Sequence, residues 1–332
     1  MSAADPVRAI ADAVLYEGYV LWPYRRSALK NTHRWTFGGV YPRGHAEARD
    51  AGDDPWTMQT QCLIEGGGGT QVGIGLRFLH VVWRQVVDGE GRERDELAVG
   101  GERHLTWEEA VEREVALAAT PLDELAAGRR ISVSIAAGRE REPLGGAGAI
   151  VRSWEPLEGA LVVSAEALAP ALYRITARIE NTTPWPGGPR EAALRRTFCS
   201  AHTTLRAAEG GAFVSQTDPP EALRGAAGGC ENRGTWPVLV GEPGARDTIL
   251  SSPIILEDHP RIAPESPGDL FDGGEIDQLL ILNIIGLTEE EKAEARASDP
   301  RVRELLDRSE GLSPQELMRL HGRTARELQV RS

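Results

Sequence analysis

Lysine and cysteine are scarce in this chain of 332 residues, and long apolar runs are missing from it. Only Lys30 and Lys292 are lysines, so arginine supplies almost all of the positive charge. The three cysteines, Cys62, Cys199 and Cys230, are too few, and odd in number, for the disulfide framework of a small secreted protein. No stretch reaches the roughly 18 apolar residues that a membrane-spanning helix needs.

Positive charge is also in short supply overall. The chain contains 37 Lys plus Arg residues against 50 Asp plus Glu residues, a formal net charge of −13. This excess of negative charge disfavours non-specific binding to nucleic acids or anionic membranes. The first 20 residues carry acidic side chains where a signal peptide has a basic flank and an apolar stretch. We therefore expect a soluble cytoplasmic protein that binds no nucleic acid and has no membrane span.

The composition is that of a globular protein, with 41% apolar residues. A chain of this length can bury a core that needs neither a metal nor a disulfide, and no cofactor is expected. Changes in periodicity divide it into three regions. Residues 1–130 form an α+β region, residues 131–257 an antiparallel β-sheet or sandwich, and residues 258–332 a linker with an acidic helical tail.

The first region combines helical and strand patterns. Apolar spacing over residues 6–20 predicts a short helix that ends near Gly18. Alternation over residues 56–65 predicts a strand, and residues 72–87 predict a second strand, central in its sheet because both of its faces are apolar.

Two helix starts follow in the sequence. The tetrapeptide Thr106-Trp-Glu-Glu109 matches a capping box and predicts a helix from that point. Thr120-Pro121 predicts a second short helix, which stops at Gly128.

The middle region alternates apolar and polar residues between regularly spaced turns, without intervening helices. This pattern favours an antiparallel β-sandwich-like body over a doubly wound sheet, so the expected fold is mainly β, of the α+β class. The predicted strands lie near residues 131–136, 149–154, 159–164, 171–181, 195–206, 211–217, 235–240 and 248–256.

The last region changes to helical periodicity after a linker rich in Pro, Gly and Asp over residues 259–274. Helix starts are expected near Glu275, at Thr288, at Asp299-Pro300 and at Ser313-Pro314.

Aromatic and basic residues interleave after the first helix, where residues 21–49 have a local charge balance of +5. This combination is typical of binding hot spots, because it unites a large contact area with directed hydrogen-bond donors. It suits an acidic protein surface, or equally an internal contact with the chain's own acidic tail. The candidate partner-binding residues are Tyr16, Tyr19, Tyr24, Arg25, Arg26, Lys30 and Arg34.

Motifs for catalysis are missing: the sequence contains no phosphate-binding loop, no G-x-S-x-G elbow and no H-E-x-x-H. Cys199 and His202 resemble a metal pair, but residues three apart in a strand point to opposite faces unless a bulge intervenes. The cysteines are therefore interpreted as structural, although a redox or metal role stays open. His80 is expected to be a hydrogen-bonded core histidine. No catalytic residue is assigned.

One alternative is an enzyme, with a metal or a small molecule in a cleft between the β body and the helical tail. Its possible metal ligands are Asp258, His259, Asp272 and Glu275, which lie in or beside the linker. A solvated linker accounts for the same acidic residues.

Distinctive sequence segments occur toward both ends of the chain. LYEGYVLWPYRRSALKN (15–31) and WTMQTQC (56–62), together with FDGGEIDQLLILNIIGLTEEEKAEARASDPRVRELLDR (271–308) and LSPQELMRLHG (312–322), cover about a third of the chain. These segments resemble uncharacterised bacterial proteins encoded beside genes of high-affinity, oxygen-tolerant nickel-iron hydrogenases. The resemblance implies a role in the assembly or operation of such a hydrogenase, and it implies no catalytic residues. The leading hypothesis is thus a non-enzymatic accessory protein that binds a hydrogenase subunit or maturation factor.

Overall fold

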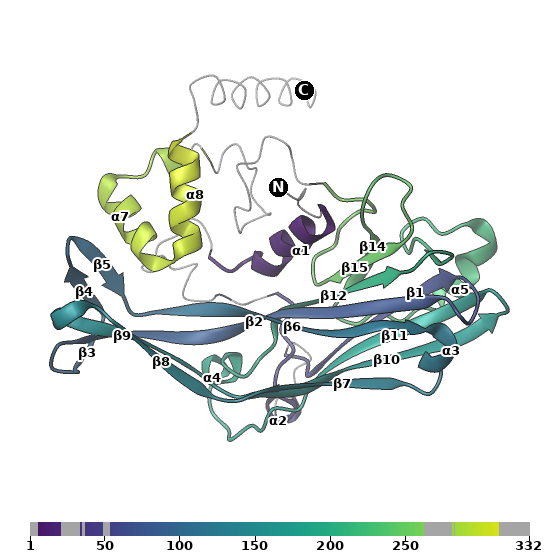
Figure 1. Cartoon of the computed structure of the whole chain (residues 1–332), viewed down its shortest axis with the longest axis horizontal. Helices are drawn as coiled ribbons and strands as arrows, with labels where there is room; N and C mark the ends of the chain where they lie inside the picture. The colour runs from purple at the N-terminus through teal and green to yellow at the C-terminus, as the bar shows by residue number, and fades with distance from the viewer. Residues whose placement is uncertain are drawn as a thin grey trace.

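A computed structural model describes residues 6–20, 34, 37–48, 54–261, 281 and 283–311 of the chain. Two antiparallel sheets pack face to face, and helices from both ends of the described chain cover the outer face of the larger sheet (Figure 1). The prediction of a mainly antiparallel β protein with short N-terminal helices and a helical tail is confirmed. No helix in the described residues is long and apolar enough to cross a membrane.

The smaller sheet has five strands in the order β13-β1-β11-β10-β7. Its strands β1 and β11 pair along their whole length, so that Met58 lies opposite Ile179 and Cys62 lies opposite Ile175. The bounds are β1 Thr57–Glu65, β7 Arg129–Ile135, β10 Leu157–Ala169, β11 Leu172–Asn181 and β13 Ala212–Phe213.

The larger sheet is built around β2 (Gln71–Asp88), which pairs with β12 and β9 along one edge and with β6 and β3 along the other. The central position expected for this strand is confirmed. Its partners have the bounds β3 Glu93–Arg94, β6 Trp107–Pro121, β8 Gly138–Pro143, β9 Gly148–Trp154, β12 Cys199–Ala207, β14 Trp236–Leu239 and β15 Thr248–Ser252. A separate hairpin joins β4 (Glu96–Val99) to β5 (Glu102–Leu105).

The main core lies between the two sheets. Phe78 of β2 and Phe198, just before β12, stack with their ring centroids 4.5 Å apart. Apolar side chains of β1, β10 and β11 close the core from the other sheet. Burial of each large apolar side chain stabilises the fold by about 1.5 to 3 kcal/mol. Both expected regions, 1–130 and 131–257, contribute strands to both sheets.

The helix predicted at Thr106 is wrong, because β6 occupies residues 107–121. The Thr106 hydroxyl does not cap a helix. Its oxygen accepts from the amide N–H of Val86 at 3.0 Å and its O–H donates to the carbonyl of Arg94 at 2.6 Å. A continuous ladder to β2 satisfies the backbone of this Glu- and Ala-rich segment, and this ladder overrides its local preference for helix.

The other differences are local. The charged segment that forms β8 was not expected as a strand, and it lies at an edge of the larger sheet. The strand expected from residue 195 begins only at Cys199, after the short helix α4 (Arg190–Leu194). The short helix expected after Thr120 is confirmed as α3 (Leu122–Leu125), and Gly128 ends it at φ +77°. Two further short helices are α2 (Arg43–Ala48) and α5 (Arg224–Gly228).

An outer layer covers β2 and β6 on the face away from the main core (Figure 1). It consists of α1 (Pro6–Tyr16), α7 (Glu289–Ser298) and α8 (Pro300–Glu310). The capping box at Thr288 and the start at Asp299-Pro300 are confirmed. The helix starts expected near Glu275 and at Ser313 lie outside the described residues.

Candidate functional site

The end of α1 and the start of α8 meet on the outer face of the larger sheet. The Tyr19 hydroxyl donates to Oδ2 of Asp299 at 2.5 Å, and both side chains are buried. Burial, together with the neighbouring Asp299 carboxylate, raises the pKa of Tyr19 well above its usual range. This contact joins residues 280 positions apart.

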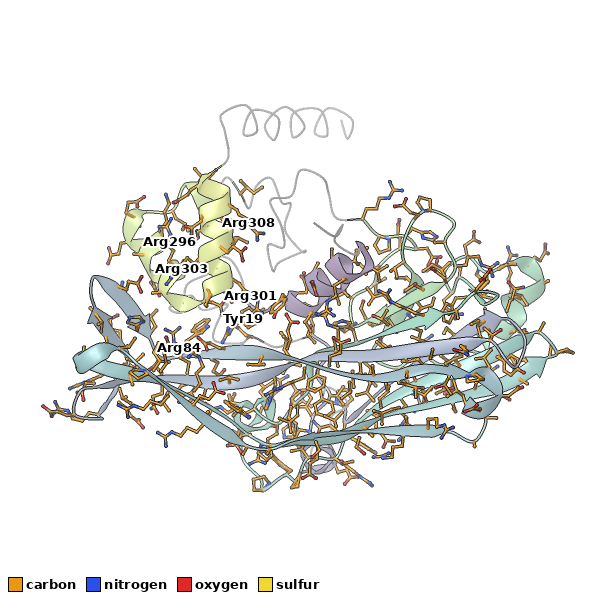
Figure 2. The ribbon with its side chains drawn as sticks, in the orientation of Figure 1. Tyr19, Arg84, Arg296, Arg301, Arg303 and Arg308 are labelled. Carbon is orange, nitrogen blue, oxygen red and sulfur yellow. The ribbon has the colours of Figure 1, made fainter. Side chains whose placement is uncertain are left out.

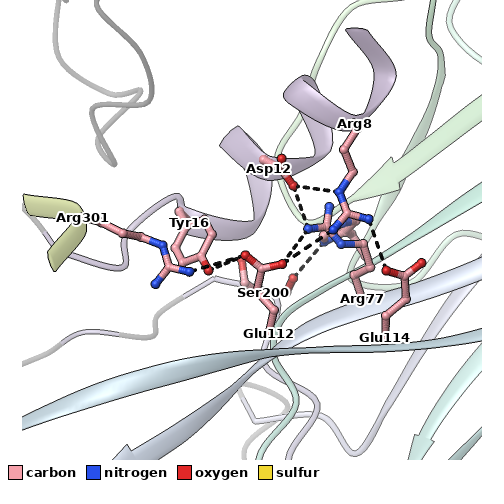
Figure 3. Close-up of polar contacts among 9 residues, drawn as sticks. Arg8, Asp12, Tyr16, Arg77, Glu112, Glu114, Ser200 and Arg301 are labelled. Carbon is pink, nitrogen blue, oxygen red and sulfur yellow. Dashed lines mark hydrogen bonds and ion pairs between the residues drawn. The ribbon is translucent and has the colours of Figure 1, made fainter. Parts of the chain in front are cut away.

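Tyr16 extends the same junction toward β6. Its hydroxyl donates to Oε1 of Glu112 at 2.6 Å, and the Arg301 guanidinium lies 4.0 Å from the centroid of its ring. Figure 3 shows Arg301 and Glu112 on either side of this tyrosine. The α8 helix is therefore held to the sheet partly through an aromatic side chain of the N-terminal segment.

Arg34 lies beneath this junction, with only 5% of its surface exposed. It donates to the carbonyl oxygens of Tyr19, at 3.1 Å, and Glu108, at 2.5 Å. Its guanidinium also lies 3.9 Å from the centroid of the Trp107 ring. Tyr16 and Tyr19 thus contact Arg301 and Asp299 of the tail, as in the alternative of docking onto the tail. Arg34 instead contacts Tyr19 and β6.

An ion-pair network continues along α1 (Figure 3). The buried Arg77 guanidinium donates through Nη2 to Asp12 at 2.7 Å and to Glu112 at 3.1 Å. Arg8 pairs with Asp12 at 3.2 Å and with Glu114 at 3.2 Å. Burial acts to raise the pKa of Glu112, but hydrogen bonds from Tyr16 and Arg77 outweigh it and lower that pKa. These ion pairs link α1 to β2 and β6.

The remaining candidate partner-binding residues, Tyr24, Arg25, Arg26 and Lys30, lie outside the described residues. Their role stays a prediction.

Asp258, a possible metal ligand, is used as an acceptor within the fold. Its Oδ2 accepts from the hydroxyls of Ser215 at 2.5 Å and Thr217 at 2.8 Å, and its Oδ1 accepts from the amide of Leu239 at 2.8 Å. His259 follows in the left-handed region at φ +55°, and its amide donates to the Leu239 carbonyl at 2.7 Å. Asp258 and His259 thus hydrogen-bond the segment that follows β15 to Leu239 at the end of β14.

The other two possible metal ligands, Asp272 and Glu275, lie outside the described residues. Within the described ranges, no three His, Cys, Asp or Glu side chains gather closely enough to hold a metal ion.

The three cysteines are free thiols, two buried and one half-buried. Burial raises the pKa of Cys62, Cys199 and Cys230, which disfavours the reactive thiolate form. The register between β12 and β2 shifts between Cys199 and His202, so a bulge does intervene there. Even so, the two side chains have different surroundings. Cys199 packs among the apolar side chains of the outer layer, and His202 Nδ1 lies 3.2 Å from the Ser200 carbonyl oxygen.

His80 is buried in the larger sheet, as expected. A backbone contact with Glu155 acts to raise its pKa, although neither ring nitrogen makes a well-formed hydrogen bond with a described residue. Burial, reinforced by the nearby Arg113, lowers the pKa of His80 to about 4. This histidine is therefore a neutral core side chain at physiological pH.

Sequence reasoning missed a buried cluster that joins α2 to α4. His45 Nε2 lies 2.9 Å from Asp54 Oδ2, and Arg190 Nε donates to both Asp54 oxygens at 3.1 Å. Burial acts to raise the pKa of Asp54, but His45 and Arg190 outweigh it and lower that pKa. Arg190 lies 136 positions from Asp54, so no local sequence pattern could have predicted the cluster.

Comparisons with known proteins add no identification: no protein-family model matches the chain, and a search of curated proteins finds no match.

Replacing Asp299 by alanine should lower the free energy of unfolding by about 2 to 3 kcal/mol. The change removes the side-chain cap of α8, which accepts from the Arg301 amide at 2.8 Å, and leaves the buried Tyr19 hydroxyl without its acceptor. Amide hydrogen exchange should show faster exchange in α7 and α8. Asp299→Asn is the matched control, since asparagine caps helices as well as aspartate does. Equal losses in the two variants would contradict this account.

Proposed function

We propose that the protein is a non-enzymatic cytoplasmic accessory protein that binds another protein, in the assembly or operation of a nickel-iron hydrogenase. The observation that carries the proposal is the contact between Tyr19 and Asp299. Each residue belongs to one of the segments that resemble hydrogenase-associated proteins, 15–31 and 271–308. The described parts of these segments, residues 15–20 and 283–308, meet on one face of the larger sheet, which supports a partner surface on that side of the molecule.

An exposed apolar groove beside α1 supports a protein-binding role. It has a volume of about 490 Å³ and is lined by Ile10, Val14, Phe37 and Ile255, among others. Ile255 is 72% exposed and Phe37 is 42% exposed. Neighbouring exposed apolar side chains often mark a protein-protein contact, and in this proposal apolar side chains of the partner fill the groove.

Affinity purification of the tagged protein from native extract tests the proposal. The wild-type protein should recover a hydrogenase subunit or maturation factor in stoichiometric amount. Arg25→Glu combined with Arg26→Glu should abolish the recovery, because two charge reversals repel an acidic partner surface. Ile255→Ser should reduce it, because the groove becomes polar. A clean monomer that carries one metal ion per chain would instead favour the enzyme alternative.

The matched control reverses another adjacent arginine pair, Arg129 and Arg130 of β7. Both are exposed, on the sheet opposite α1, and their ion pairs with Glu124 and Glu180 are surface pairs worth at most about 1 kcal/mol each. This variant should fold and recover the partner normally. Equal loss in both double variants would contradict the proposed surface.

A further inference from the structure

A small pocket lies beside the N-terminal half of α1, on the outer face of the larger sheet. Its volume is about 240 Å³. Since a water molecule in the liquid takes up about 30 Å³, the pocket can hold a molecule of about eight to ten non-hydrogen atoms.

Two glycines of β2, Gly73 and Gly75, form the floor of this pocket. A Cβ atom added at Gly75 would meet only one atom within 4 Å, Oε1 of Glu114 at 3.9 Å. Its neighbours in register are the small residues Ala116 of β6 and Thr204 of β12. Glycine in the interior of a strand weakens it, and often marks a site where a ligand approaches the backbone. The register of β2 and β6 shifts at Gly73, which accounts for that glycine, but no shift accounts for Gly75.

Three arginines surround the floor: Arg8 from α1, Arg77 from β2 and Arg206 from β12. Glu114 also lines the pocket, and its carboxylate pairs with Arg8. Figure 3 shows the guanidinium groups of Arg8 and Arg77 side by side under α1. The arginines of α7 and α8 are not among the residues that line it. Those labelled in Figure 2 lie toward the β4–β5 end of the sheet.

The Arg77 guanidinium has one buried nitrogen without a hydrogen-bond acceptor among the described residues. It is 5% exposed, and both of its acidic partners are engaged through Nη2. Its Nη1 has no hydrogen-bond partner within the described part of the chain. A buried guanidinium nitrogen without an acceptor is costly, and an oxyanion is the acceptor that guanidinium groups bind most strongly. Because Nη1 is shielded from solvent, a direct contact with an anion in the pocket requires a small rotation of the Arg77 guanidinium.

From these features we propose that the pocket binds a small organic anion, a carboxylate or phosphate ester with a short apolar body. The oxyanion lies among Arg8, Arg77 and Arg206, and the apolar body lies over Gly75 against Val7, Ala11 and Ala116. The site is independent of the proposed partner surface, so either can fail without the other.

Calorimetric titration of the full chain with hexanoate and butyl phosphate tests the site, with 1-hexanol as the neutral analogue and acetate as the analogue without a long body. At least one of the two alkyl anions should bind at one site per chain, at least about tenfold more tightly than acetate or 1-hexanol. Absence of saturable binding for both alkyl anions would overturn the proposal, as would equal binding of 1-hexanol.

Two variants localise the binding. Gly75→Val should abolish it by filling the pocket. Far-ultraviolet circular dichroism and the thermal midpoint should stay at or above wild-type values, since valine favours strands and its Cβ would meet only Glu114 Oε1, at 3.9 Å. Arg206→Gln should weaken binding at least about tenfold, by loss of a charge-assisted contact. The control Arg139→Gln, at an exposed arginine on β8 of the same sheet, should bind as wild type does. Unchanged binding in Gly75→Val, or equal effects at Arg206 and Arg139, would overturn the proposal.

Discussion

Replacing Phe198 by alanine should lower the free energy of unfolding by about 3 to 5 kcal/mol, the usual cost of truncating a buried phenylalanine. The Phe198 ring is fully buried and stacks on Phe78 at 4.5 Å. It also passes over Gly159 of β10, where an added Cβ would lie 2.7 Å from a ring atom. The ring therefore touches both sheets, and its removal leaves a cavity between them. Urea unfolding followed by tryptophan fluorescence measures the loss.

The control for this variant is Phe37→Ala. Phe37 is 42% exposed at the edge of the apolar groove, so its truncation should cost less than about 1 kcal/mol. If the two phenylalanines gave similar losses, the core between the sheets would not be the main source of stability.

Acid should destabilise the protein steeply between about pH 6.5 and pH 4. His80 and His202 are fully buried, and burial lowers the pKa of each to about 4. In the unfolded chain each has a pKa near 6.5, so below that pH the unfolded state binds more protons than the native state does. Stability is thus complete above pH 6.5 and falls by about 3 kcal/mol per histidine as the pH reaches 4. Urea unfolding at a series of pH values measures the slope.

His80→Leu isolates one half of this effect. The substitution replaces a buried ring without a well-formed hydrogen bond by an apolar side chain, so stability at pH 7 should be unchanged or higher. The slope between pH 6 and pH 4.5 should fall in this variant, and fall further in the double variant with His202→Leu. His104 and the ion-paired carboxylates, whose pKa values are also lowered, account for the slope that remains. An unchanged slope in the double variant would show that other groups cause the acid sensitivity.

Elements with a strong local signal could be predicted from the sequence. The apolar residues on both faces of β2 indicated a central strand, and the caps at Thr288 and Asp299 indicated α7 and α8. The failure at β6 has the opposite cause. The Glu- and Ala-rich sequence of β6 favours a helix locally, while its pairing with β2 depends on residues about 25 to 50 positions away.

The candidate site could be predicted only in part. The interleaved aromatic and basic residues after the first helix were visible in the sequence, and so was the possibility that they dock on the tail. The specific partners of Tyr16 and Tyr19 were not, since Glu112 and Asp299 lie 96 and 280 positions away. The anion pocket had a weaker signal, two glycines alternating in a strand pattern. This signal gains meaning only when α1 and β12 bring arginines to the same face.

The distance along the chain between Tyr19 and Asp299 also sets an order of events during synthesis. A ribosome adds about 5 to 20 residues per second, so about 15 to 55 s separate the appearance of these two residues. In the part of that interval after β2 is synthesised, its outward-facing apolar side chains, including Leu79 and Val81, lack the cover that α8 later supplies. A nascent chain thus exposes an apolar sheet face until α7 and α8 emerge, and this is the period in which a chaperone would bind it.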